Sequence, residues 1–299
     1  MAQQEYKKLT DKLFMYKGMV YNVDDRLNQS LEYLDSLLDF KIKDDDLFVV
    51  TFPKSGTVWT QRIITLLYED DFPELKDELI PKQMPWLEFR KIEQDYNIRR
   101  SPRLFCSHLH QHLIPLGLQG KGKIIYVTRN PKDIMVSYFH FSQIMTRFDT
   151  WETYNGMIEK FFTGEMLGGC WFDHVNGWYN NRDKYNILFL SYEEMIKDLR
   201  AAVVKICQFV GKTLSDAALD SVVERASFNY MKQDPKANYE FMSSTDKVPG
   251  KGAFLRKGTV GDWKNYLTVA QNEYFNQVYQ EKMKDIPLEI VWDITKQKN

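Results

Sequence analysis

Four short apolar runs, separated by stretches with helical spacing, constrain the fold of this chain most strongly. The runs cover residues 47–52, 103–107, 123–128 and 186–191, and helical periodicity recurs at 58–68, 133–144, 153–162 and 199–210. Strands that alternate with helices in this way predict an α/β fold, with a central parallel β-sheet flanked by helices on both faces. No repeat or low-complexity linker divides the sequence, so we expect one domain over residues 1–299.

Polar residues lie within two positions after three of the four runs. Lys54 comes after the first run, His108 after the second and Arg129 after the third. Ligands of parallel sheets bind beyond the carboxyl ends of the strands. We therefore expect these three side chains to converge on one rim of the sheet.

The segment between the first run and the first helix is a candidate site for an anion. It has the sequence T-F-P-K-S-G-T-V-W at residues 51–59 and places the backbone N–H groups of residues 55–58 at a helix N-terminus. An ordinary turn with a solvated lysine is the alternative for this segment alone. The ATP-binding P-loop needs two glycines, with a lysine after the second, whereas Lys54 precedes the only glycine, Gly56. The loop thus favours a phosphate-type group smaller than a triphosphate.

Composition narrows the class of ligand. Lys and Arg number 40 against 41 Asp and Glu, which gives a net charge of −1. Such a chain lacks the basic field that attracts nucleic acid or an anionic membrane surface, so small molecules or protein are the expected partners.

The first ten residues are polar and no run of about 18 apolar residues occurs, which predicts a cytoplasmic protein. Cys106, Cys170 and Cys207 are too widely spaced for a disulfide or zinc framework, and we expect reduced thiols.

Three histidines alternate just after the second run, at positions 108, 110 and 112. A His-x-His metal site with Cys106 alongside is one interpretation, but no carboxylate lies close in sequence to complete it. A general base needs only one of the three, since imidazole titrates in the right range. We expect a base and no metal.

Two long segments, residues 72–97 and 234–252, combine prolines with aromatic residues and lack clear periodicity. Apolar residues in long loops can form a lid over an apolar ligand. Packing of each loop onto its own core is the alternative. We expect both segments to be mobile lids.

Four motifs in this order resemble those of the cytosolic sulfotransferases, and the resemblance extends along nearly the whole chain. They are residues 51–59, S-H-L at 107–109, R-N-P-K-D at 129–133 and R-K-G-T-V-G-D-W-K at 256–264. G-A-F-L at 252–255, I-P-L at 286–288 and W-D at 292–293 look most like the branch named for amine sulfation. The resemblance implies in-line transfer of a sulfuryl group, without a metal, from 3′-phosphoadenylyl sulfate (PAPS) to a hydroxyl or amine. The acceptor would be a small apolar phenol, hydroxysteroid or arylamine.

The same resemblance implies roles for individual residues. His108 matches the general base, and Lys54 matches the cation that stabilises the leaving group. Nucleotide contacts are implied for Lys54, Ser55, Gly56, Thr57, Val58, Trp59, Arg129, Ser137, Tyr192, Ser227, Phe228, Arg256, Lys257 and Gly258. Acceptor contacts are implied for Phe52, Trp86, Phe89, Cys106, Phe141, Tyr239, Phe241 and Met242. The pattern K-x-x-x-T-V-x-x-x-E, formed by Lys264, Thr268, Val269 and Glu273, implies a homodimer.

The chain departs from the family pattern near the base. Cys106 stands where many relatives carry a lysine, although hydroxysteroid-type relatives also lack it, and His110 stands where proline is usual. An extra positive charge near the transferred group is thus missing at Cys106, and His110 is a candidate to alter the acceptor pocket or its pH response. Three alternatives stay open: selective N-sulfation of amines, a P-loop kinase or hydrolase that needs Mg²⁺, and a protein of the same fold that binds nucleotide or steroid without turnover.

Overall fold

The strand β4 (Leu47–Thr51) lies inside a four-stranded parallel sheet and is buried along its whole length. The structure is a computed structural model that describes residues 5–294. The sheet has the order β5-β4-β6-β7, and its other strands are β5 (Leu104–Ser107), β6 (Lys123–Thr128) and β7 (Ile187–Ser191). All three neighbouring pairs are parallel. The predicted central parallel sheet is confirmed, with strand bounds that differ by at most one residue.

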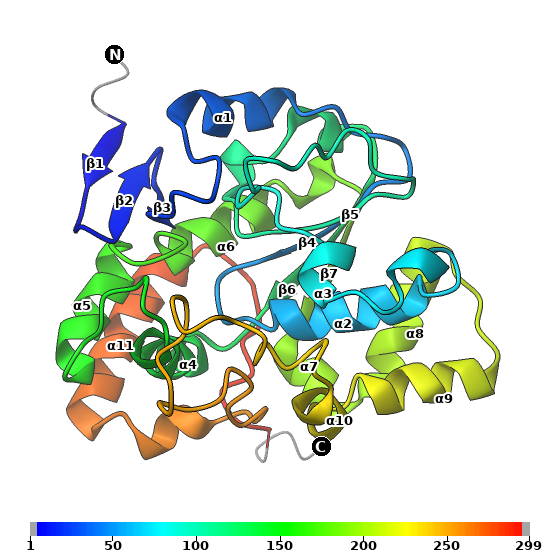
Figure 1. Cartoon of the computed structure of the whole chain (residues 1–299). Helices are drawn as coiled ribbons and strands as arrows, with labels where there is room; N and C mark the ends of the chain where they lie inside the picture. The colour runs from blue at the N-terminus through cyan, green and yellow to red at the C-terminus, as the bar shows by residue number, and fades with distance from the viewer. Residues whose placement is uncertain (1–4, 295–299) are drawn as a thin grey trace.

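Helices cover both faces of this sheet because successive side chains of a strand point to opposite sides. Leu47 and Val49 pack into a cluster with α2 (Thr57–Leu67), α8 (Leu199–Val210) and α9 (Asp216–Arg225). Phe48 and Val50 pack on the other side, where α6 (Trp171–Asn180) contributes Trp178. Figure 1 shows α2, α8 and α9 on one side of the sheet, and α4 (Pro131–Ile144), α5 (Tyr154–Thr163) and α11 (Val269–Met283) on the other.

The remaining helices are short. They are α1 (Leu31–Ser36), α3 (Ile80–Gln83), α7 (Tyr192–Lys197) and α10 (Phe228–Gln233). Within residues 5–294, none of the helices is both long and apolar enough to cross a membrane.

A second sheet, which the sequence did not predict, is formed by the N-terminal strands β1 (Tyr6–Lys8), β2 (Leu13–Tyr16) and β3 (Met19–Asn22). Its strands are antiparallel. Lys17 and Gly18, with φ of 49° and 80°, join β2 to β3, and two residues at positive φ form the tight turn that suits a twisted hairpin. This sheet brings the start of the chain next to the cavity described below.

The loops after β4 and β6 leave the sheet toward opposite sides. β5 pairs on one edge of β4 and β6 on the other, and the following helices α2 and α4 lie on opposite sides of the sheet (Figure 1). Such a reversal of direction opens a crevice at the carboxyl ends of the two strands. Lys54 and Arg129 lie at this position.

The first predicted lid, residues 72–97, is partly attached to the sheet. The N–H of Leu87 donates to the carbonyl of Cys106 at 2.9 Å, and the N–H of Cys106 donates to the carbonyl of Pro85 at 2.9 Å. Residues 85–87 thus extend the sheet beyond the edge of β5, and a bridge joins Trp86 to Cys106. This part of the segment is ordered sheet rather than the loop that we expected. Mobility of the rest stays a prediction.

Candidate active site

The loop between β4 and α2 has a backbone conformation that few residues adopt. Lys54 and Gly56 both have positive φ, 71° and 104°. A Cβ atom on Gly56 would lie 2.9 Å from the ring of Tyr192, so a larger residue does not fit. Gly56 is the N-cap of α2, whose first N–H groups have no partner within the helix. The loop therefore presents backbone donors and a positive helix end, as the sequence predicts.

Four basic residues line one part of a cavity of about 320 Å³, and we call Lys54, Arg129, Arg256 and Lys257 the cation cluster. The guanidinium of Arg129 lies 4.0 Å from the centre of the Tyr192 ring. Arg256 and Lys257 each pair with Asp262 at 2.6 Å. The sequence motifs that contain these basic residues lie far apart in the chain, and the fold brings them together.

Mutual repulsion within the cation cluster affects the charge of Lys54. Burial lowers the pKa of the Lys54 ammonium, and the charges of Arg129 and Arg256 lower it further, to about 7. Asp262 supplies a negative charge beside Arg256 and Lys257. Burial raises the pKa of the Asp262 carboxyl group, but hydrogen bonds from Lys257, Asn265 and Arg256 outweigh that effect and hold this pKa at about 2. The cluster is thus poised to gain a proton when an anion binds.

Aromatic rings lie next to the cation cluster. Trp59 contacts Tyr192 edge-on, with ring centres 5.3 Å apart, and both line the cavity together with Phe228. Gly258 has φ 65°, and a Cβ there would lie 2.4 Å from the Phe228 ring, so only glycine permits this approach. Thr57, Val58 and Ser137 line the same cavity.

Two of the expected nucleotide contacts lie just outside the lining. The side chain of Ser55 is fully buried. Ser227 caps α10, where its hydroxyl accepts from the N–H of Tyr230 at 3.4 Å. Their contacts with a nucleotide stay predictions.

The rest of the cavity is apolar. We define its apolar part by Asn22, Trp86, Phe89, His108, Phe141, Met145, Phe148, Leu167, Tyr239, Met242 and Phe254. The ammonium of Lys54 lies 3.8 Å from the centre of the Phe141 ring and 4.7 Å from that of Phe254. Lys54 thus stands where the basic and apolar parts meet.

His108 follows β5 directly, and its ring is oriented by the backbone of β4. Its Nδ1 lies 2.6 Å from the carbonyl oxygen of Thr51. Because a carbonyl oxygen only accepts, Nδ1 carries the proton and Nε2 keeps a free lone pair. The ring is 7% exposed and packs against Trp86 with centres 4.4 Å apart. Burial lowers the pKa of His108 to about 3, with a contribution from the charge of Lys54, so the imidazole is neutral at pH 7.

A buried carboxyl group, Glu88, holds the backbone at this position. Its Oε1 accepts from the N–H of His108 at 2.6 Å, and its Oε2 is buried without a partner among the described residues. Burial raises the pKa of Glu88 to about 7. Sequence reasoning missed this residue, because the contact joins two segments 20 positions apart.

The three alternating histidines do not share a ligand site. Whereas His108 bonds Thr51, the Nε2 of His110 lies 2.8 Å from the carbonyl of Gly168 and that of His112 lies 3.0 Å from the carbonyl of Lys17. Among residues 5–294, no group of three His, Cys, Asp or Glu is placed to hold a metal ion. His110 is buried and does not line the cavity, and its effect on the acceptor pocket or on the pH response stays a prediction.

Five of the eight expected acceptor residues line the cavity, namely Trp86, Phe89, Phe141, Tyr239 and Met242. Phe52, Cys106 and Phe241 do not line it, and their contacts with an acceptor stay predictions. Phe52 instead packs against Phe161 and His174. Cys106 lies inside the sheet, where its sulfur accepts from the side chain of Gln61 at 2.9 Å. Phe241 is 38% exposed and packs on the outer side of Tyr239.

Several lining residues were not predicted: Asn22, Met145, Phe148, Leu167 and Phe254. Phe254 lies within the G-A-F-L motif, which already pointed to this region. Two apolar runs at 13–16 and 19–21, separated only by Lys17 and Gly18, would have signalled the hairpin that carries Asn22. The other three had no local signal.

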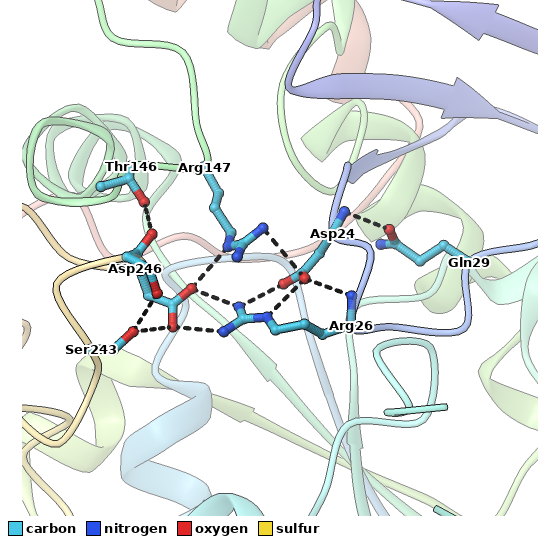
Figure 2. A network of polar contacts seen from close by, with 8 residues as sticks. Asp24, Arg26, Gln29, Thr146, Arg147, Ser243 and Asp246 are labelled. Atoms are coloured by element: carbon cyan, nitrogen blue, oxygen red, sulfur yellow. Dashed lines mark hydrogen bonds and ion pairs between the residues drawn. The ribbon is translucent and has the colours of Figure 1, made fainter. Parts of the chain in front are cut away.

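The second predicted lid, residues 234–252, is tied to two distant segments by charged side chains (Figure 2). Asp246 pairs with Arg26 at 2.6 Å and with Arg147 at 2.8 Å, and both arginines also pair with Asp24. Backbone hydrogen bonds join Thr146 to Asp246 and Val248 to Ile144. We call Asp24, Arg26, Arg147 and Asp246 the lid anchor. It holds the loop that contributes Tyr239 and Met242 to the cavity.

The segment expected to form a dimer contact lies at the surface. Thr268 caps α11 with a reciprocal hydrogen bond to Gln271, which is the helix-start role of this position. Val269 is 74% exposed, Glu273 is exposed, and Lys264 pairs with Asp293.

The cation cluster lies at the carboxyl ends of β4 and β6, beside the apolar part of the cavity. This arrangement defines a class of α/β protein whose site suits an anionic ligand next to an apolar one. The sulfotransferase domain family matches residues 44–287. The chain is 44% identical to the amine sulfotransferase of Oryctolagus cuniculus over 293 residues, 96% of each chain. It is 38% identical to the 3-beta-hydroxysteroid sulfotransferase of Cavia porcellus, over 93% of this chain and 97% of that one. The structure of mouse sulfotransferase SULT7A1, complexed with 3′-phosphoadenosine 5′-phosphate (PAP), matches with a TM-score of 0.74 at 31% identity, over 93% and 96% of the two chains.

The chain therefore belongs to the sulfotransferase family, and it is a PAPS-dependent enzyme. The residues present fit this co-substrate. Ser55 Oγ and Arg129 Nε are buried without a partner among residues 5–294, beside four cations and the glycine-permitted approach to Phe228. Unpaired buried donors of this kind are what an anionic ligand satisfies.

Proposed function

We propose that the chain transfers the sulfuryl group of PAPS to a hydroxyl or amine of a small, largely apolar acceptor, by in-line transfer with His108 as general base and without a metal. The orientation of His108 carries this proposal. Its Nδ1–H is committed to Thr51, so Nε2 accepts a proton from a molecule in the cavity. A positioned base of this kind contributes about a hundred- to ten-thousand-fold.

The low pKa of His108 is consistent with this role. A base must be neutral before it acts, and burial keeps this imidazole unprotonated at pH 7. An anion bound at the neighbouring cation cluster raises the affinity of Nε2 for a proton, because it stabilises the imidazolium that forms. The carboxyl group of Glu88, which accepts from the His108 N–H, acts in the same direction when it is ionised.

Lys54 supplies the positive charge on the other side of the reaction. PAPS, when bound, provides the sulfuryl group and a phosphate leaving group. Lys54 stands at the junction of the basic and apolar parts, where that leaving group develops negative charge. Its pKa of about 7 means that an anion draws a proton onto it. Arg129, Arg256 and Lys257 bind the phosphates by charge-assisted hydrogen bonds.

The apolar part binds the acceptor. Aromatic and methionine side chains dominate its lining, as a phenol, hydroxysteroid or arylamine site requires. The names of two relatives, an amine sulfotransferase and a hydroxysteroid sulfotransferase, support an acceptor within this range. The higher identity with the former makes amine-selective N-sulfation the second candidate.

The proposed setting is a cytoplasmic homodimer. The exposed Val269 and the pattern of Lys264, Thr268 and Glu273 support a small contact with a second copy. Such a contact buries less surface than a standard interface, so the dimer is expected to be concentration-dependent.

Incubation with labelled PAPS, a chelator and a panel of a phenol, a 3-hydroxysteroid and an arylamine tests the proposal. Label on any acceptor supports metal-independent sulfuryl transfer, and the ranking separates O-sulfation from N-sulfation. Activity that appears only with Mg²⁺ would favour a P-loop type of reaction. Tight PAP binding without transfer to any acceptor would favour a binding protein.

A further inference from the structure

The N-terminal sheet contributes one amide side chain, that of Asn22, to the apolar part of the cavity. Asn22 ends β3, lines the cavity and is only 8% exposed. Its carboxamide makes no hydrogen bond to any of residues 5–294. A buried amide is unfavourable unless it is hydrogen-bonded. Asn22 therefore leaves one donor and one acceptor group for a molecule in the cavity.

The strand fixes the position of this amide. The register of β2 and β3 pairs Asn22 with Leu13. Residues two positions apart in a strand share a face, so Asn22 points the same way as Val20. Val20 packs in the cluster that contains Phe148 and Leu167, which also line the cavity. The amide thus faces the cavity on a rigid element rather than on a loop.

Asn22 and the proposed base line the same cavity from different elements, since Asn22 ends β3 and His108 follows β5. Ring contacts run from His108 to Trp86 at 4.4 Å, from Trp86 to Phe89 at 5.9 Å and from Phe89 to Tyr21 at 6.5 Å. Tyr21 precedes Asn22 in β3, and its side chain points to the opposite face of the strand. Trp86 and Phe89 line the cavity together with His108 and Asn22, and a flat, rigid, multi-ring compound suits a lining of this kind.

The charged groups near this wall are already paired. Asp24, Arg26 and Arg147 bind one another in the lid anchor (Figure 2). No charged side chain belongs to the apolar part as defined above, and Lys54 stands where that part meets the cation cluster. A charged group beside Asn22 would lose its hydration without gaining a counter-ion. The complementary group is uncharged.

We propose that Asn22 is a second recognition point, for a carbonyl or hydroxyl oxygen at the far end of a rigid, extended acceptor. This inference rests on the proposed function and narrows it. The amide N–H donates to a carbonyl, and the amide oxygen accepts from a hydroxyl. An acceptor that lacks this oxygen leaves the Asn22 amide without a hydrogen-bond partner. The site therefore discriminates against such an acceptor.

Two probes that differ only at the far end test this role: a 3-hydroxysteroid with a carbonyl on the terminal ring and its analogue with a methylene there. Dissociation constants are measured with saturating PAP, and kcat/KM with labelled PAPS. The wild type should prefer the carbonyl steroid by about 10-fold. Asn22→Leu should reduce this ratio to about 1, since it removes the amide without a large change in volume. Met145→Leu, a matched apolar change in the same lining, should keep the ratio.

Folding of the variant is controlled within the experiment. Asn22→Leu should bind the methylene steroid at least as tightly as the wild type. Asn22→Asp provides a second test, because a carboxylate accepts from a hydroxyl but cannot donate to a carbonyl. It should prefer the terminal hydroxyl analogue over the carbonyl steroid.

A wild type without preference, or a preference that survives in Asn22→Leu, would overturn the inference and leave the proposed function intact. Binding of neither steroid would also overturn it. An Asn22-dependent preference in binding without any sulfuryl transfer would support the inference and contradict the proposed function.

Discussion

The guanidinium of Arg129 donates a hydrogen bond of 2.8 Å to the carbonyl oxygen of Lys54. This bond joins the end of β6 to the loop after β4, across the point where the chain reverses direction in the sheet. It also stabilises Lys54 in its unusual backbone conformation with φ 71°. One backbone carbonyl therefore joins Arg129, a proposed nucleotide contact, to Lys54, the proposed catalytic cation.

Replacement of the proposed base should abolish turnover and spare nucleotide binding. His108→Ala is expected to lower kcat by about 100- to 10,000-fold, because it removes the group that we propose accepts the acceptor's proton. The affinity for PAP, measured by calorimetry, should change less than about twofold, since His108 lies outside the cation cluster. His112→Ala, on an exposed residue, is the control and should retain activity. An equal loss of kcat and PAP affinity in His108→Ala would remove it from this role.

Loss of a phosphate contact should weaken nucleotide binding. Arg256→Ala is expected to weaken PAP binding by about 1.5–3 kcal/mol, the range for a hydrogen bond to a charged group. Asp262 then keeps Lys257 and Asn265 as partners, which limits the loss of stability. Lys251→Ala, an exposed residue nearby, is the matched control. Unchanged affinity in Arg256→Ala would show that another residue binds the phosphate.

Nucleotide affinity should depend on pH through Lys54. Its pKa of about 7 in the free protein means that the ammonium is largely neutral at pH 8.5 and charged at pH 6. An anion favours the charged form, so binding of PAP at pH 8.5 should take up a proton and affinity should fall as pH rises through 7. Calorimetry in buffers of different ionisation enthalpy measures this uptake. Lys54→Arg, which stays charged, should abolish it, and uptake that persisted there would point to a different group.

The lid anchor should tighten acceptor binding. Asp246→Asn removes the carboxylate that pairs with Arg26 and Arg147, and it should weaken acceptor binding by about 1 kcal/mol, or about fivefold. PAP affinity should stay unchanged. Added salt should produce part of this effect in the wild type and less in the variant. Asp216→Asn, whose ion pair with Arg200 is remote, is the control. Wild-type affinity in Asp246→Asn would mean that the backbone pairing alone holds the loop.

The proposed dimer should dissociate when a charge is placed at its centre. Val269→Glu adds a carboxylate to an exposed apolar side chain, and sedimentation should then detect monomers at concentrations where the wild type is dimeric. Ile98→Glu changes a residue that is 82% exposed elsewhere and should leave the assembly unchanged. A monomeric wild type would contradict the dimer itself.

Sequence by itself determined the parallel sheet and the rim of the active site. Apolar runs and helical spacing are local patterns, and they predicted the four strands to within one residue and the position of Lys54, His108 and Arg129 beyond the strand ends. The order His108, Lys54, Arg129 along the rim follows from the strand order β5-β4-β6, which the sequence did not predict.

Only the tertiary structure decided which side chains face the cavity. Phe52 and Trp86 are both aromatic, yet Phe52 packs against Phe161 while Trp86 packs against His108. They differ because Phe52 follows the central strand β4, whereas Trp86 pairs at the edge of the sheet. Asn22 and Glu88 reach the site through contacts with segments distant in the chain. Local sequence patterns reflect backbone preference and burial, whereas the lining of a cavity depends on long-range packing, which no single segment encodes.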